Sequence, residues 1–189
     1  MTLEITLKLE DSDLQHFNEL FEDARTRRAS FNDQVLLRSA RQLIQGGLSG
    51  DPPSFVARRL EELDRLVAMT EDDAWNLPAE ERNRILDALA YFVAADDIIP
   101  DSTPVLGLLD DAIAAEIVLR TLRHELEAYE EFSRYRAAEA QRRANVGKST
   151  DISKEDWLAD KRASLHHRMR QRRMADPQGW HTITLWGHD

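Results

Sequence analysis

Carboxylates gather in one short stretch of this chain, residues 96–111, which also holds two prolines and one glycine. Four of them have the type and spacing to bind a hard cation: Asp97, Asp101, Asp110 and Asp111. Magnesium and calcium take several oxygen ligands, so converging aspartates are chemically suitable. The alternative is structural, because aspartate is a common helix cap: the first two cap a helical hairpin and the other two pair with arginines. No other cofactor is expected.

A second set of residues has the chemistry to contact nucleic acid. Residues 2–10 alternate between apolar and polar side chains, which is the period of a half-buried strand, and two helical patterns follow. This order over residues 2–46 resembles a ribbon-helix-helix domain, in which the strands of two copies pair and read the major groove. The resemblance, with the need for phosphate contacts, implies Thr6 and Lys8 on the strand and Arg25, Arg27 and Arg28 around the end of the first helix. The alternative is a plain strand that closes a helical core or a dimer.

One basic run, residues 161–173, has the charge to contact nucleic acid, a membrane or an acidic surface of the chain itself. The chain has 35 acidic and 25 basic residues and a formal net charge of −10, which disfavours bulk nucleic-acid binding. We therefore expect this run to be solvated or to pair within the chain. The chain has no cysteines, and His124 lacks the second histidine four residues on that a zinc helix requires. These observations do not favour an enzyme.

The aspartate stretch must be positioned by the helices on either side of it. A proline disfavours helical geometry in the residue before it, so the preceding helix is expected to end just before Pro100. A helix can restart around Thr103, since proline is tolerated in a first turn, and Gly107 permits close approach of a neighbouring helix. The sequence therefore predicts a tight helical hairpin, with apolar arms at residues 85–93 and 105–122.

The same hairpin carries a family resemblance over about residues 85–132. It resembles the YkvA-like family of bacterial domains in the order and spacing of Leu89-Ala90-Tyr91, then residues 97–101 (Asp-Ile-Ile-Pro-Asp), then residues 104–111 (Pro-Val-Leu-Gly-Leu-Leu-Asp-Asp). It departs at Ala95, where the family usually has proline. The family is described as having no known activity, and many members look membrane-associated. The resemblance implies a helical interaction or membrane-proximal module.

A membrane span is not expected for this chain. The hairpin arms are short, and charges such as Asp87, Asp110 and Glu116 interrupt them. A charge at the centre of a bilayer costs about 2.5–3.5 kcal/mol on insertion scales. The N-terminus shows no basic region followed by an apolar core, so no signal peptide is expected. These features favour a cytoplasmic protein.

The remaining pattern is helical, with a strand at each end. Residues 180–186 alternate as residues 2–10 do. Since a lone strand rarely persists, the two strands either pair with each other or pair across a homodimer. Helices are expected near residues 14–27, 30–44, 52–67, 78–97, 111–145 and 153–169, with Gly46-Gly47 ending the second. We expect a mainly α protein, a helical bundle around the central hairpin, with short N- and C-terminal β-strands.

Three segments follow from these patterns. They are a strand-helix-helix segment at residues 1–50, a helical core with the YkvA-like hairpin at residues 51–146, and a C-terminal helix and strand at residues 147–189. The leading hypothesis is a non-enzymatic protein-interaction or scaffolding module, homodimeric through its N-terminal strand, with an unidentified protein partner. The alternatives are a ribbon-helix-helix DNA-binding regulator and a divalent-metal-binding protein that uses the four aspartates.

Overall fold

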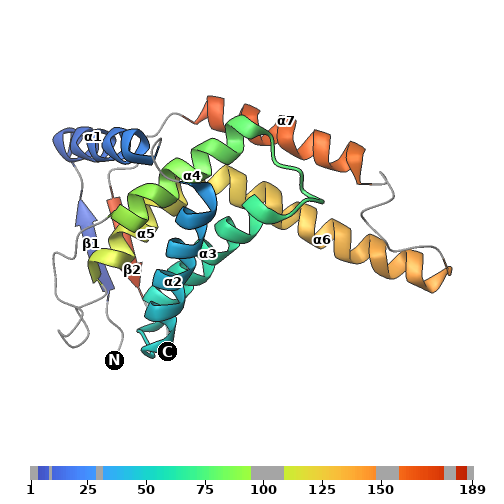
Figure 1. Cartoon of the computed structure of the whole chain (residues 1–189), viewed down its shortest axis with the longest axis horizontal. Helices are drawn as coiled ribbons and strands as arrows, with labels where there is room; N and C mark the ends of the chain where they lie inside the picture. Colours follow the sequence, from blue (N-terminus) through green and yellow to red (C-terminus); the bar gives the residue numbers. More distant parts are fainter. Residues whose placement is uncertain are drawn as a thin grey trace.

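The computed structural model of the chain is mainly α, as expected (Figure 1). It describes residues 4–8, 10–28, 32–94, 109–147, 158–176 and 182–186, with the backbone alone at residues 4–8, 11–14, 16–18, 109–111 and 182–186. The described helices are α1 Asp11–Arg28, α2 Asp33–Ser49, α3 Ser54–Glu71, α4 Ala79–Ala94, α5 Leu109–Thr121, α6 Arg123–Asn145 and α7 Ala159–Ala175, and the strands are β1 Glu4–Lys8 and β2 Thr182–Trp186. No helix in this described part is long and apolar enough to cross a membrane.

The apolar core lies among α2, α3, α4 and α5. α2 packs against α3 and α4, and α5 packs against the same two helices. The largest fully buried side chains in these helices are Leu37, Ile44, Leu63, Leu66, Met69, Ile85, Leu86, Leu89 and Ile117. Removal of this apolar surface from water is therefore the main force that holds α2 to α5 together.

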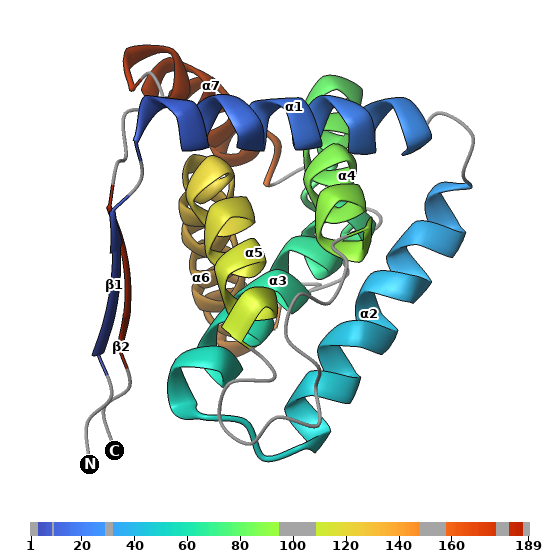
Figure 2. The same cartoon turned by 90° about the vertical axis from the view of Figure 1, so that its left-hand side faces the viewer.

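Helix α1 lies across α4 at one end of the molecule (Figure 2). The ring of Phe21 stacks on the ring of Tyr91 in α4, with 4.5 Å between the ring centroids. Ala24, one turn further along α1, is buried. Aromatic stacking and a small residue thus allow α1 to approach α4 closely.

Helix α2 continues to Ser49, so the prediction that Gly46-Gly47 ends it is wrong. The Ser49 hydroxyl donates to the Gln45 carbonyl at 2.7 Å. A Cβ added at Gly47 would lie 2.7 Å from Leu60 Cδ1 of α3. The missing side chain therefore lets α3 come close, and packing of α3 against this turn keeps the turn helical.

The long helical pattern that follows residue 111 is divided at Leu122 into α5 and α6. Leu122 has φ −111° and ψ 18°, and its side chain is fully buried. Its N–H still donates to the Val118 carbonyl at 3.1 Å, and the Leu126 N–H donates to the Leu122 carbonyl at 3.0 Å. The chain bends here without losing these hydrogen bonds, so that α5 packs on α3 and α4 while α6 packs on α7.

The two strands pair with each other in antiparallel orientation within one chain. The register places Ile5 opposite Leu185, and Leu7 opposite Ile183. Figure 2 shows this ribbon at one edge of the molecule. The N-terminal strand therefore has an intrachain partner, as in the first of the two alternatives that the sequence leaves open.

Candidate functional site

The four aspartates of the expected cation site lie at the limits of the described structure. Asp97 and Asp101 fall outside the described residues, and Asp110 and Asp111 lie in the first turn of α5, where only the backbone is described. A first turn is where the helix dipole favours carboxylates. Among the described residues, no group of three or more histidines, aspartates or glutamates is arranged to hold a metal ion. The cation site stays a prediction, and melting the chain with and without magnesium tests it.

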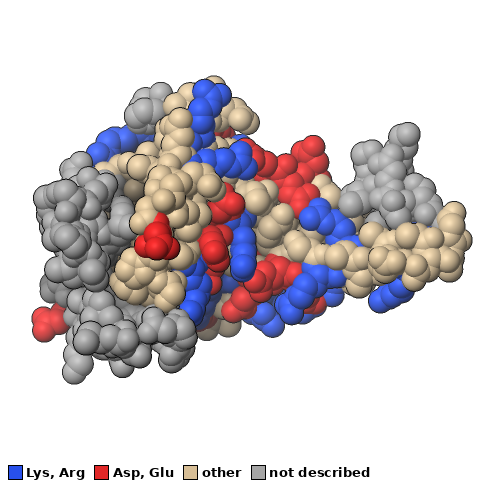
Figure 3. All heavy atoms as spheres, turned by 90° about the horizontal axis from the view of Figure 1, so that it is seen from below, with Lys and Arg blue, Asp and Glu red and all other residues tan. Residues whose placement is uncertain are grey.

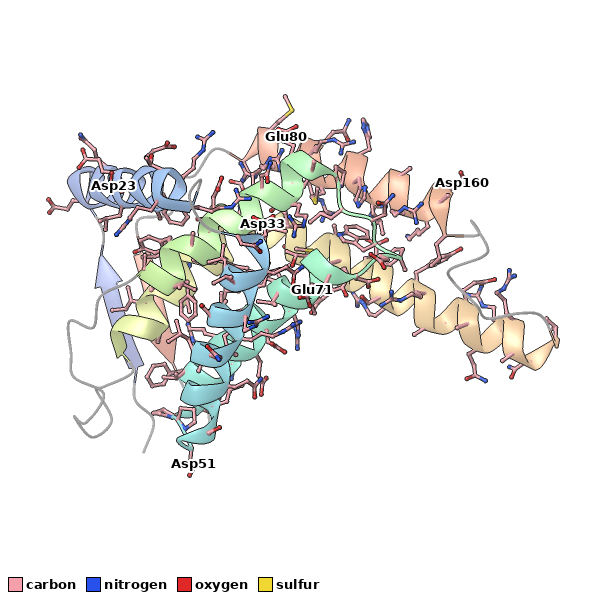
Figure 4. The ribbon with its side chains drawn as sticks, viewed as in Figure 1. Asp23, Asp33, Asp51, Glu71, Glu80 and Asp160 are labelled. Carbon is pink, nitrogen blue, oxygen red and sulfur yellow. The ribbon has the colours of Figure 1, made fainter. Side chains whose placement is uncertain are left out.

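The acidic excess of the chain is spread over separate elements. Figure 3 shows lysines and arginines interleaved with aspartates and glutamates on the face that it presents. Figure 4 labels six carboxylates that come from different helices and one loop and do not converge: Asp23, Asp33, Asp51, Glu71, Glu80 and Asp160. On this face the charges of both signs alternate and form no large patch of one sign, so ion pairs between elements are expected.

The arginines expected to contact phosphate lie where α1 meets α2 and α4. Arg28 donates from Nη1 to Asp87 Oδ1 at 2.7 Å and from Nη2 to Asp33 Oδ1 at 3.3 Å. Arg25 Nε lies 3.8 Å from Asp87 Oδ2. Arg82 Nη1 donates to Asp33 Oδ2 at 2.5 Å, and this hydrogen bond is the main reason that the pKa of Asp33 is below its ordinary value.

Arg28 in this cluster is largely buried, with 16% of its side chain exposed. Arg25 and Arg28 therefore tie α1 to its neighbours. Arg27 is exposed, and the side chains of Thr6 and Lys8 lie outside the description. Contact of this set with DNA stays a prediction.

The basic run in α7 pairs with acidic residues of α6, which is one of the two alternatives, solvation or pairing within the chain, that the sequence leaves open. Lys161 Nζ donates to Glu131 Oε1 at 2.7 Å, and Arg168 Nη1 donates to Glu131 Oε2 at 3.0 Å. Arg172 Nη1 donates to Glu127 Oε2 at 3.1 Å. The hydrogen bond from Lys161 is the main cause that holds the pKa of Glu131 below its ordinary value. These three cations recur along one flank of α7.

Two carboxylates lie fully buried beneath α7. Glu81 of α4 is 1% exposed and Glu125 of α6 is 0% exposed. Arg173 of α7 donates from Nη1 to Glu125 Oε1 at 3.0 Å and also to Glu81 Oε2. Arg84 Nε lies 3.6 Å from Glu125 Oε1. Both carboxylates thus depend on a guanidinium that another helix supplies, and removing one partner of a buried pair typically costs about 3–5 kcal/mol.

An aromatic cluster forms the apolar part of the same surface. Trp75, in the turn between α3 and α4, has its ring centroid 4.9 Å from Phe132 of α6 and 4.2 Å from His166 of α7. Desolvation by burial, followed by the charges of Arg170 and Arg162, lowers the pKa of His166 to about 4. His166 is therefore neutral at pH 7 and packs as an aromatic side chain.

Asp72 fixes the turn that carries Trp75. Its Oδ1 accepts from the N–H groups of Ala74 at 3.0 Å and Trp75 at 3.3 Å. Its Oδ2 accepts from the Tyr129 hydroxyl at 2.9 Å and from Arg136 Nη1 at 2.7 Å. Sequence reasoning missed this residue, because its partners on α6 lie 57 and 64 positions away. The turn is thereby held against α6.

Together these contacts define the α7 docking site. It is the surface of α4, α6 and the intervening turn that consists of Trp75, Glu81, Glu125, Glu127, Glu131 and Phe132. Four of these six residues carry a carboxylate. A cationic helix with a narrow apolar stripe is therefore the kind of segment that it accepts.

Unsatisfied polar atoms lie in and beside the α7 docking site. Five buried side-chain atoms in the described part of the chain lack a hydrogen-bond partner: Trp75 Nε1, Arg84 Nε, His124 Nδ1, Glu125 Oε2 and His166 Nε2. Trp75 contacts His166, and His124 Nε2 lies 3.2 Å from Asp176, the residue that follows α7. A buried polar group without a partner costs about 1–3 kcal/mol. Docking of α7 is therefore less stable than its ion pairs alone suggest.

Comparison with known proteins gives one match to a family. The sequence profile of the family described as "Protein of unknown function (DUF1232)" matches residues 84–116, which run from α4 into α5. No curated protein and no solved structure matches the chain. The match supports a domain of unknown function over these residues, and residues 95–108, where the turn of the expected hairpin falls, lie outside the described residues. It does not confirm the YkvA-like name or the ribbon-helix-helix resemblance.

Proposed function

We propose that the chain is a non-enzymatic protein-interaction module of the cytoplasm and that it meets a partner protein through the end of α6. The observation that carries this proposal is the projection of residues 137–147, here called the α6 extension, away from the other helices (Figure 1). Most residues of the extension are exposed. Its visible surface in Figure 3 is mostly uncharged, which suits a protein better than a polyanion.

The α6 extension is a preformed helical surface. Two of its polar contacts are local: Arg142 donates to Glu139 at 2.8 Å, and Gln141 donates to Asn145 at 3.0 Å. Propagation from the packed part of α6 keeps the extension helical, and an ordered segment binds at a lower entropic cost than a disordered one. Val146, 68% exposed, ends the extension with an apolar side chain.

The use of charge in the rest of the chain supports an interaction role over catalysis. The ionisable clusters around Arg28 and Arg173 join helices to one another. Their carboxylates are already neutralised by arginines of the same chain. Charge in these clusters therefore stabilises the fold, which leaves them little capacity for catalysis.

A photo-crosslinking amino acid in the α6 extension tests the proposal. We would place it at Gln141 and, as a matched control, at Gln45 of α2, since both positions are exposed. In the cells that produce the protein, a discrete adduct is expected from position 141 and not from position 45. An adduct of the chain with itself would identify the partner as a second copy that binds at the extension, and not at the N-terminal strand through which a homodimer is expected from the sequence.

A second step measures the same contact with purified proteins. Arg142→Glu is expected to weaken binding of the crosslinked partner by about tenfold or more. The substitution reverses a charge on the extension, so a partner surface that complements Arg142 would be repelled by the glutamate. Identical adducts from positions 141 and 45, or an unchanged affinity, would remove the extension as the binding surface.

A further inference from the structure

We propose that the α7 docking site is a binding site for a basic amphipathic helix of a partner protein, and that α7 occupies this site as an internal competitor. This inference does not rest on the α6 extension, which lies elsewhere on the molecule. It concerns a second surface and assigns a partner chemistry to it.

Helix α7 shows which residues such a partner helix must carry. Leu165, Met169 and Arg173 follow one another at intervals of four, so they share one face of the helix. The two apolar side chains are buried, and the guanidinium reaches both Glu81 and Glu125. A partner therefore needs apolar residues at positions i and i+4 and an arginine at i+8.

The flank of α7 adds a second requirement. Lys161, Arg168 and Arg172 lie on the side that faces α6 and pair there with two carboxylates, Glu131 and Glu127. Complementary charge aligns a helix and speeds its association. A helix with basic residues along this one flank is thus oriented in the same direction as α7.

Arginine is the cation that the buried part of the site selects. Two fully buried carboxylates lie within reach of one guanidinium, and a guanidinium offers five donors in a planar fork that matches carboxylate oxygens. Glu125 Oε2 has no hydrogen-bond partner when α7 is docked. A partner that brings one further donor to this oxygen satisfies an atom that α7 leaves unpaired.

The same unpaired atoms make displacement of α7 feasible. A tethered segment competes at an effective concentration in the millimolar range, so a partner must bind more tightly than α7 does. All five buried atoms without a hydrogen-bond partner in the described structure lie in or beside this interface. These missing hydrogen bonds lower the intrinsic affinity of α7 for the site. A partner helix that supplies hydrogen bonds to these atoms would bind with higher affinity than α7.

The test uses the full chain and a labelled peptide of residues 158–176 as the probe. Arg168→Glu with Arg172→Glu places carboxylates opposite Glu131 and Glu127 and so weakens docking of α7 within the chain. The peptide is expected to bind this variant about tenfold or more tightly than the wild-type chain, measured by fluorescence anisotropy. A peptide of the same composition in scrambled order is expected to bind neither protein.

A charge-swapped variant is the matched control. Adding Glu127→Lys and Glu131→Lys to the first variant restores opposite charges across the interface and repels the basic peptide. Peptide binding is then expected to fall by about tenfold or more. Circular dichroism checks that each variant is folded, and the milder pair Arg168→Gln with Arg172→Gln replaces the first variant if that variant is not folded.

Three results would overturn the proposal. The first is equal binding of the ordered and scrambled peptides, and the second is peptide binding that persists in the charge-swapped variant. The third is a dimer of the weakened variant that the peptide dissociates, because this would assign the site to α7 of a second copy. None of these results bears on the crosslinks from position 141, so the two proposals fail separately.

Discussion

Helices α2 to α5 and helix α7 are held in place by different kinds of contact. The core helices bury rows of large apolar side chains. Helix α7 buries only Leu165, His166 and Met169 among its described residues, and its polar contacts are mostly ion pairs, with one hydrogen bond from Arg162 to the Ala74 carbonyl. Apolar burial changes little with pH or salt, but ion pairs and buried histidines respond to both. The difference indicates that α7 can open while the core stays folded, as low-stability segments of many proteins do.

The largest expected effect comes from the core. Leu63→Ala removes a fully buried side chain of α3 and leaves a cavity, so it should lower the free energy of unfolding by about 2–5 kcal/mol. Urea denaturation followed by circular dichroism measures this value. Leu43→Ala on α2, where the side chain is 49% exposed, should change it by about 0.5 kcal/mol or less. Equal effects of the two substitutions would contradict the assignment of the core.

Arg173→Met should act on α7 alone. It leaves Glu81 and Glu125 buried without the guanidinium that they share, at a cost of about 3 kcal/mol. Since α7 can detach, the loss should show as faster hydrogen exchange in residues 159–175 with little change in α3. Arg172→Met is the control, because its exposed pair with Glu127 contributes about 1 kcal/mol or less. Loss of protection throughout the chain would show that α7 and the core open together.

Acid should loosen α7 through His166. Its pKa of about 4 in the folded chain lies below the unfolded value of 6.5, so the unfolded chain binds more protons between these pH values. Docking stability therefore falls as the pH is lowered through this window, by roughly 2–3 kcal/mol. His166→Leu should flatten the dependence.

Two glutamates respond to acid with opposite signs in that experiment. Desolvation raises the pKa of Glu62 in α3, so protonation of Glu62 at acidic pH favours the folded core. The lowered pKa of Glu131 makes its pairs weaken only below its ordinary value. A pH dependence that survives in the His166→Leu variant above about pH 5 would rule out His166 as the group responsible.

Salt should give the smallest effect. The flanking pairs of α7 are partly exposed, with side-chain exposures of 26–51% for Lys161, Arg168 and Arg172. Raising sodium chloride from about 0.05 M to about 0.5 M should weaken docking of α7 by about 1 kcal/mol or less, because the Debye length shortens. The unfolding midpoint of the core serves as the internal reference. A core that loses as much stability as α7 would remove the contrast between the two regions.

The helices were predictable from the sequence because their apolar residues recur at helical spacing. The differences arise where packing decides. Gly46-Gly47 is a common helix end, but close contact of Gly47 with Leu60 keeps α2 helical. The bend at Leu122 carries no proline or glycine to mark it, since it depends on the directions in which α5 and α6 pack.

The α7 docking site was predictable only in part. The basic run was evident from the composition, and pairing within the chain was one of the two outcomes expected for it. Its buried partners were missed because Glu81 lies 92 residues and Glu125 lies 48 residues from Arg173. The sequence contains one indication of these buried carboxylates. Glu81 precedes Ile85 by four residues, and Glu125 precedes Phe132 by seven. Each carboxylate therefore lies on the apolar face of its helix. A carboxylate on such a face requires a partner from another element.

Native-state hydrogen exchange of the full chain at low urea concentrations measures the contrast between the two regions most directly. We expect the opening free energy of α7, residues 159–175, to be lower than that of α3, residues 54–71, and to fall further with salt and acid while that of α3 holds. If both helices open with the same free energy, and salt and pH change the two values equally, the result would contradict the conclusion that charge holds α7 and apolar burial holds the core.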